Sequence, residues 1–292
     1  MIKFWKQLET ELKLRGFSKL TIKTYLLHNQ KFIDFLKSEG TGAEYQKSLL
    51  SKGSDRTPED VTNRDLKAYI AYLLSDKGLS PASVNLVISA LKFNYVEVLK
   101  KQIFAGIVHP KPNKKLPVVL TKEEIRNMVD LTKNKKHKLL ILLLYSTGLR
   151  VSEAVSLRLR DINLKEKTAF IKYGKGKKER FVKLSNIFIK KYTSYIKKRK
   201  NSSIYLFNSV KSPISTRQAE RIVKKASLRA GLQKKVFCHA LRSSFATHLL
   251  DNGTDIRVIQ ELLGHANLAT TERYTHVSKK RILEVRSPAD NL

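Results

Sequence analysis

Apolar residues recur every three or four positions through the first forty residues of the chain. Two such stripes follow one another between Ile2 and Glu39, and Gly16 and Gly40 interrupt the pattern after each of them. This spacing puts the apolar side chains on one face of a helix, and glycine is a common helix end. The pattern therefore predicts two amphipathic helices, followed by a polar loop from Thr41 to Pro58.

Capping signals predict two further helices. Thr62 and Asp65 have the spacing of a capping box, in front of apolar residues that continue towards Gly78. Ser80 followed by Pro81 is typical of a helix start, because serine accepts a bond from the first turn and proline fits its first position. We expect this helix to run towards residue 101. Four helices of these lengths predict a small all-α domain.

A change of composition follows the fourth helix. Between Lys100 and Pro117 the chain has five lysines, three prolines and no acidic residue, which is typical of an interdomain linker. We therefore divide the chain into a helical domain at residues 1–105, a basic linker at 106–117 and a second domain at 118–292. The linker is equally compatible with a plain spacer and with a segment that follows a phosphate backbone.

The second domain begins with more helix signals. Thr121 and Glu124 form another capping-box pattern, and an apolar helix is predicted from His137 to Thr147, with Gly148 as its end.

Arg150 comes next, at the predicted start of another short helix, where backbone N–H groups favour an anion. Glu153, three residues later, could orient a basic neighbour. Taken alone, such an arginine is more often part of an ordinary surface ion pair.

A hairpin is predicted after this short helix. Thr168–Tyr173 and Arg180–Leu184 are strand-like, and a glycine- and lysine-rich loop joins them. Lys175 lies between two glycines at the tip, where it could reach into a groove, although a loop lysine is usually just solvated. Helices at 186–200 and 215–230 and a short strand at Ile204–Phe207 are also predicted.

Basic side chains and a tyrosine gather near the C-terminal end. His239 and Arg242 are three residues apart on a predicted helix, so both lie on one face and can address one anion. His265 follows a glycine, and Arg273 and Tyr274 follow on a further short helical segment. A phenol near guanidinium and imidazole groups suggests a nucleophile that acts on a phosphate, whereas a lone tyrosine is usually a surface residue.

The charge of the chain narrows the class of partner. The 292 residues include 58 Lys and Arg but only 25 Asp and Glu, a formal net charge of +33. This excess favours a polyanion as the partner, most simply nucleic acid, although a generally basic proteome or a ribosome-associated protein would also carry it.

Cys238 is the only cysteine, which excludes an intrachain disulfide and a cysteine-rich zinc site and favours the cytoplasm. The longest apolar run, Leu139–Tyr145, is too short for a membrane helix.

Five short motifs together resemble those of one enzyme family. They are Thr147-Gly-Leu-Arg-Val-Ser-Glu153, Gly174-Lys-Gly-Lys-Lys-Glu-Arg180, His239-Ala-Leu-Arg242, Leu263-Gly-His265 and Tyr274-Thr-His276. In this order and spacing they resemble the tyrosine recombinase (integrase) family, and within it the Xer-type recombinases, nearest to the archaeal XerA-like branch. The resemblance covers nearly the whole chain. Ser243 departs from bacterial relatives, which often carry a histidine there.

The resemblance implies a fold, a partner and a reaction. The fold would be mainly α with a small β-sheet: a helical, SAM-like core-binding domain and an α+β catalytic domain. The partner would be double-stranded DNA at a dif-like site, bound by a homotetramer on paired sites. Strands would be cut and rejoined through a 3′-phosphotyrosyl intermediate, with no cofactor and no metal. The implied catalytic residues are Arg150, Lys175, His239, Arg242, His265 and the nucleophile Tyr274.

Two other functions stay open on the sequence alone. Chromosome dimer resolution is the first expectation, and the integrase or excisionase of a virus or mobile element would use the same chemistry. A protein of another class, a DNA-binding protein that keeps the fold without catalysis, would not need all six residues. Their presence argues against it.

Overall fold

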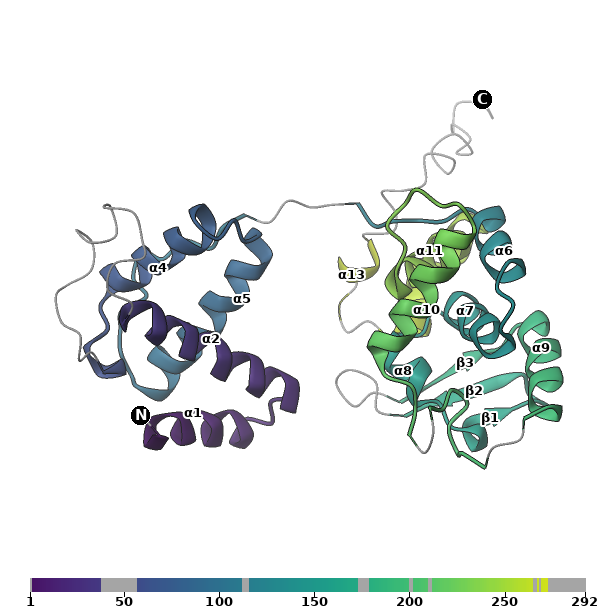
Figure 1. Ribbon diagram of the computed structural model, residues 1–292, viewed down its shortest axis with the longest axis horizontal. Helices are drawn as coiled ribbons and strands as arrows, with labels where there is room; N and C mark the ends of the chain where they lie inside the picture. The colour runs from purple at the N-terminus through teal and green to yellow at the C-terminus, as the bar shows by residue number, and fades with distance from the viewer. Residues whose placement is uncertain are drawn as a thin grey trace, which may run out of the picture. The chain divides into compact units, whose positions relative to one another are not determined.

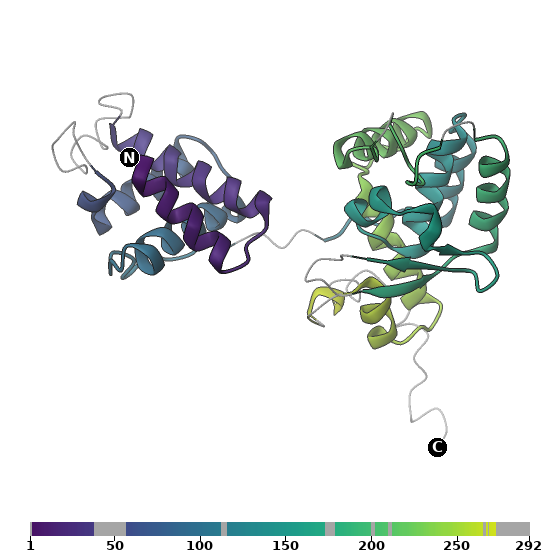
Figure 2. The same ribbon diagram turned by 90° about the horizontal axis from the view of Figure 1, so that it is seen from below.

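The protein forms two compact units, Met1–Lys114 and Lys115–Leu292 (Figures 1 and 2). The computed structural model describes residues 2–37, 57–111, 116–172, 179–199, 202–209, 212–264, 267 and 269–272. Within these ranges no helix is long and apolar enough to cross a membrane.

The first unit is entirely helical in its described residues, as its apolar pattern predicts. Its elements are α1 (Ile2–Leu14), α2 (Lys19–Lys37), the 3-10 turn η1 (Pro58–Asp60), α4 (Asn63–Ser75), α5 (Pro81–Lys92) and the π-helical segment η2 (Phe93–Val98). Helix α2 packs against α1, α4 and α5 around a buried apolar cluster. Most of the predicted loop at 41–58 lies outside the described residues.

The predicted caps form, but the fourth helix ends differently from its prediction. Ser80 caps α5, and the box of Thr62 and Asp65 caps α4. Helix α5 gives way to π-helical turns, in which Leu99 N–H donates to the carbonyl of Asn94, five residues back. Lys100 then adopts a positive φ of 56°, which ends the helix because an L-residue cannot continue a right-handed helix there.

The second unit combines helices with one small sheet. Its elements are α6 (Lys122–Asp130), α7 (Lys135–Thr147), α8 (Val151–Ser156), the 3-10 turn η3 (Leu159–Asp161), β1 (Ile162–Asn163), β2 (Thr168–Ile171), β3 (Arg180–Lys183), α9 (Asn186–Lys197), α10 (Thr216–Arg229), α11 (Cys238–Asp251), α12 (Ile256–Leu263) and α13 (Ala269–Glu272). The predicted mix of helices and a small sheet is confirmed.

Helix α7 is the centre of this unit (Figure 1). It packs against α6, α8, α9, α10 and α11. The six residues from Leu139 to Leu144 are all buried, which explains why the helix has apolar residues all round instead of one stripe. Because both of its ends are fixed by packing on several sides, the turn that follows Thr147 is a rigid place for functional groups.

The sheet is antiparallel, in the order β1-β2-β3. The predicted hairpin is confirmed in its strands, and Thr168 pairs with Lys183; its tip, at 173–178, lies outside the described residues. Figure 2 shows α12 beside strand β3. Strand β1 has only two residues, too few to give an alternating pattern.

The predicted strand at Ile204–Phe207 is wrong. Within this segment, Tyr205 makes an isolated bridge to Arg158 in place of a ladder, and Asn208, the next residue after the segment, bridges to Pro213. Its backbone bonds go to irregular segments on either side, so its apolar residues reach the core without a partner strand.

Candidate active site

The turn between the end of α7 and the start of α8 lies against α11 and the end of α12. Gly148 ends α7 with a φ of 61°, in the left-handed region that favours glycine. A side chain there would also collide with Phe245 of α11, and its Cβ would lie 2.8 Å from Leu263 Cδ2 of α12. Gly148 therefore allows both the turn and the close approach of α11 and α12.

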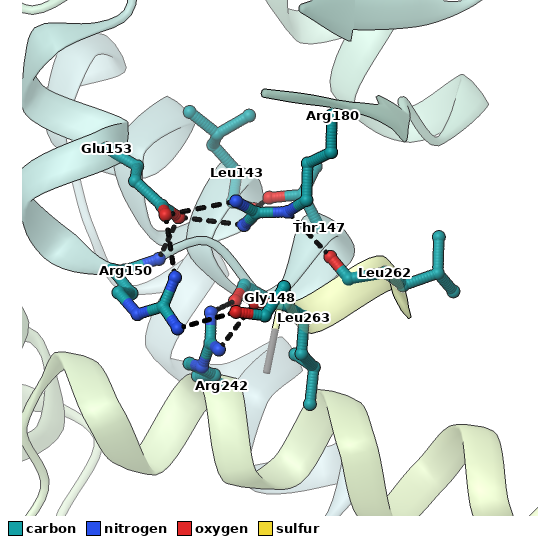
Figure 3. Close-up of polar contacts among 10 residues, drawn as sticks. Leu143, Thr147, Gly148, Arg150, Glu153, Arg180, Arg242, Leu262 and Leu263 are labelled. Atoms are coloured by element: carbon teal, nitrogen blue, oxygen red, sulfur yellow. Dashed lines mark hydrogen bonds and ion pairs between the residues drawn. The ribbon is translucent and has the colours of Figure 1, made fainter. Parts of the chain in front are cut away.

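Arg242 on α11 fills the centre of this junction. The residue is 2% exposed, and its guanidinium donates to the carbonyls of Gly148 (Nη1, 2.6 Å) and Leu263 (Nη2, 2.8 Å) (Figure 3). These carbonyls lie at the C-terminal ends of α7 and α12, where the helix dipole and unpaired carbonyls favour a cation.

Arg150 occupies the N-cap position of α8, as predicted. Its Nη2 donates to the carbonyl of Gly264 at 3.0 Å, and its Nη1 donates to Glu153 Oε1 at 2.9 Å. The backbone N–H of Arg150 also donates to Glu153 Oε2 at 2.9 Å. Glu153 therefore orients Arg150, as the sequence suggested, and the arginine side chain keeps 25% of its surface exposed for a ligand.

A third arginine, Arg180, completes the group. It is the first residue of β3, and it binds both oxygens of Glu153, with Nη1 to Oε1 at 3.0 Å and Nη2 to Oε2 at 2.8 Å. Its Nε donates to the carbonyl of Leu262 at 2.9 Å. The sequence predicted Arg180 as the first residue of a strand and the last residue of a family motif, but gave it no partner. The burial of Glu153 explains the need for a second cation, because a buried carboxylate is costly unless it is paired.

Burial and charge act on Glu153 in opposite directions. Burial alone would raise its pKa, but the hydrogen bonds and positive charge of Arg180, joined by bonds from Arg150, outweigh this and lower the pKa below the ordinary value of 4.5. The carboxylate is therefore ionised at neutral pH. Three guanidiniums and one carboxylate leave the junction with a net charge of about +2, which suits an anion such as a phosphate diester.

His239 lies in the first turn of α11, three residues before Arg242, and is exposed. Arg242 is buried because its guanidinium turns inward to the two helix ends, whereas His239, one turn earlier on the same helix, is exposed. Phe237 provides no cap for α11, and Glu220 of α10 takes this role by accepting the N–H of Cys238 at 2.9 Å.

The described residues thus bring Arg150 and Arg242 together on adjacent carbonyls and place His239 one turn away along α11. The other three predicted catalytic residues, Lys175, His265 and Tyr274, lie outside the described residues. In the sequence, Lys175 lies between strands β2 and β3, and His265 follows Gly264, the C-cap of α12.

Comparison with known proteins identifies the family. Residues 118–281 match the phage integrase family, and residues 4–104 match the phage integrase N-terminal SAM-like domain. The tyrosine recombinase XerA of Pyrococcus horikoshii is 38% identical over 284 residues, which cover 96% of this chain and 90% of the relative. The tyrosine recombinase XerD of Oceanobacillus iheyensis is 34% identical over 289 residues, covering 93% and 92%.

A solved structure of another recombinase is also similar to this chain. The XerH site-specific recombinase bound to its palindromic difH substrate matches with a TM-score of 0.70 and 26% identity, over 96% of this chain and 83% of that one. The chain therefore belongs to the phage integrase family, as a Xer-type tyrosine recombinase that carries out site-specific DNA recombination.

Proposed function

We propose that this recombinase cuts and rejoins one DNA strand at a time through a 3′-phosphotyrosyl intermediate. Tyr274 is the nucleophile, and Arg150 and Arg242 bind the scissile phosphate. Lys175 is the general acid, and His239 and His265 are the remaining active-site pair. These roles come from the family resemblance, and the arrangement of the two arginines supports them.

The observation that carries the proposal is the placement of Arg150 and Arg242. Both guanidiniums bind the end of α12, and neither can move without breaking contacts to backbone carbonyls. Attack on a phosphodiester builds negative charge on the non-bridging oxygens, and fixed guanidiniums stabilise such charge by several kcal/mol without reorganising. Planar arginine groups also suit phosphate geometry better than lysine does.

The proposed step balances without an external energy source. The phenolic oxygen of Tyr274 forms a bond to phosphorus as the bond to the 5′-oxygen breaks, and Lys175 gives a proton to that leaving oxygen. One phosphodiester is exchanged for another, so the reverse attack by a 5′-hydroxyl rejoins a strand and releases the tyrosine.

The named relatives support a proposal for the biological role. Several are Xer recombinases, and XerH is bound to a difH substrate. We infer that this enzyme acts in the cytoplasm on a dif-like chromosomal site, as a tetramer on two paired sites, and resolves chromosome dimers. Its helical domain at 1–105 and catalytic domain at 118–292 would both contribute to DNA binding, with the basic segment 106–117 as the connection in the chain.

A nicked suicide substrate tests the chemistry. The wild-type protein should form a covalent adduct with DNA, and Tyr274→Phe should bind the same DNA without forming one. Tyr192→Phe, at a buried tyrosine of α9 in the core, is a control for the loss of one hydroxyl and should still form the adduct. An adduct that persists in Tyr274→Phe would show that another residue is the nucleophile.

A further inference from the structure

Arg180 has no role in the proposed reaction, yet its side chain makes three hydrogen bonds in the junction. It is the residue at which the hairpin returns from the loop with Lys175. Its side chain is 10% exposed, binds both oxygens of Glu153 and donates to the carbonyl of Leu262 (Figure 3).

We propose that Arg180 is a positioning residue for strand cleavage, which fixes Arg150 through Glu153 and fixes the end of α12 through Leu262. The inference rests on the proposed function, since the position of Arg150 matters only if Arg150 binds the scissile phosphate.

The bonds to Glu153 show how Arg180 acts on Arg150. Each carboxylate oxygen accepts one bond from each residue: Oε1 from the two Nη1 atoms, and Oε2 from the Arg150 backbone N–H and Arg180 Nη2. The carboxylate cannot rotate without breaking bonds to both. If Arg180 were absent, the buried carboxylate would bind the Arg150 guanidinium more completely and draw Nη2 away from Gly264.

The end of α12 shows the second part of the role. Three consecutive carbonyls accept bonds from three different arginines: Leu262 from Arg180, Leu263 from Arg242 and Gly264 from Arg150. The last carbonyls of a helix have no partner within it, so these bonds fix where the chain leaves α12.

Gly264 allows Arg180 to come close to the end of α12. A side chain at this position would place its Cβ 3.2 Å from Arg180 Nη1, and Gly264 adopts a φ of 63°. The next residue is His265, one of the proposed catalytic residues. Arg180 therefore contacts both the carboxylate that holds Arg150 and the helix end that precedes His265 in the sequence.

Single-turnover cleavage of the suicide substrate, with DNA affinity measured separately, tests the inference. Arg180→Met should lower the cleavage rate about 100-fold, the cost of a misplacement of about 1 Å, with a Kd within about threefold of wild type. Arg180→Lys keeps the charge but cannot bind Glu153 and Leu262 together, and should lose about 10-fold. Arg180→Lys also tests the inference if Arg180→Met does not fold.

Arg199 supplies a matched control. It donates to the carbonyls of Ser203 and Tyr205. Arg199→Met removes the same group and the same charge, and should cleave at the wild-type rate. A cleavage rate for folded Arg180→Met equal to that of Arg199→Met would overturn the inference.

A double-mutant cycle identifies the route. If Arg180 acts through Arg150, then adding Arg180→Met to Arg150→Lys should lower the rate much less than 100-fold, because the position of Arg150 is already lost. Full additivity of the two losses would overturn the route through Glu153.

The pH dependence of cleavage is a further test, because a purely structural role of Arg180 would not change it. Without Arg180, burial should raise the pKa of Glu153, so the ratio of the Arg180→Met rate to the wild-type rate should fall further between pH 7 and pH 5. Other charged groups that line the hollow beside Glu153 are Arg158, Asp161 and Lys172, and the last two pair with each other at 3.6 Å. A ratio independent of pH would argue against this route.

The result can be separated from a failure of the proposed function. If wild-type protein forms no adduct, or if Tyr274→Phe forms one, the assigned reaction is wrong, whatever the Arg180 variants do. If wild-type protein and Tyr274→Phe behave as proposed and Arg180→Met cleaves normally, only the positioning role is wrong.

Discussion

Arg150 and Arg242 bind neighbouring carbonyls at one helix end, Gly264 and Leu263, although the two arginines come from different helices. The spacing between their guanidiniums is therefore set by one peptide unit of α12 and by the turn at Gly148. Because both arginines donate to backbone carbonyls at helix ends, the pair is held in place before a substrate arrives. Such preorganisation is what an anionic transition state requires.

Loss of either arginine should stop cleavage, but the two losses should differ in stability. Arg150→Ala and Arg242→Ala should each lower single-turnover cleavage by about 10³-fold or more. Arg242 is buried, so its loss leaves two carbonyls without partners and should cost about 2–4 kcal/mol, against about 1 kcal/mol for the partly exposed Arg150. Urea unfolding measures this difference. Cleavage close to the wild-type rate in either variant would remove that arginine from the site.

Gly148 should tolerate a side chain less well than a glycine with the same backbone conformation. Gly148→Ala combines the cost of a positive φ with a collision against Phe245, and should destabilise the protein by about 3–4 kcal/mol. Gly231, with a φ of 68° and open space around it, is the matched control and should cost about 1 kcal/mol as alanine. Equal urea midpoints for the two variants would contradict the close approach at Gly148.

Glu153 should give the stability a dependence on acid pH. Its folded-state pKa is lowered, so its contribution is complete above about pH 4.5 and is lost as the pH falls through the lower value. Glu153→Gln should therefore cost about 3 kcal/mol at pH 7, and the difference from wild type should shrink below pH 4.5. Glu9→Gln, which breaks an exposed pair with Lys13, should change the free energy of unfolding by less than about 0.5 kcal/mol. A Glu153→Gln difference that is constant down to pH 3 would be inconsistent with this ion pair.

DNA binding should depend strongly on salt. The formal net charge is +33, and a protein that neutralises about eight phosphates would give a slope near −7 in log K against log salt. Titration of a labelled duplex between 50 and 300 mM salt measures it. A slope smaller than about 2 in magnitude would exclude so extensive a set of phosphate contacts.

The local signals in the sequence predicted the helices well. The caps at Thr62, Ser80 and Thr121 each need only residues within one turn, so the residue types at fixed spacing are sufficient. The same reasoning placed Arg150 at a helix start with Glu153 as its orienting partner. It failed at Ile204–Phe207, where an apolar run looks like a strand but makes only an isolated bridge to Arg158 among the described residues.

The sequence by itself determined the family motifs, the helices and their ends, and the strong positive charge. Only the tertiary structure decided that Arg180 shares Glu153 with Arg150, and that three arginines bind three consecutive carbonyls of α12. Arg180 is 27 residues from Glu153 and 82 from Leu262. No periodicity or capping rule links positions so far apart, because their contact is created by the packing of α7, α11 and α12 around a glycine turn.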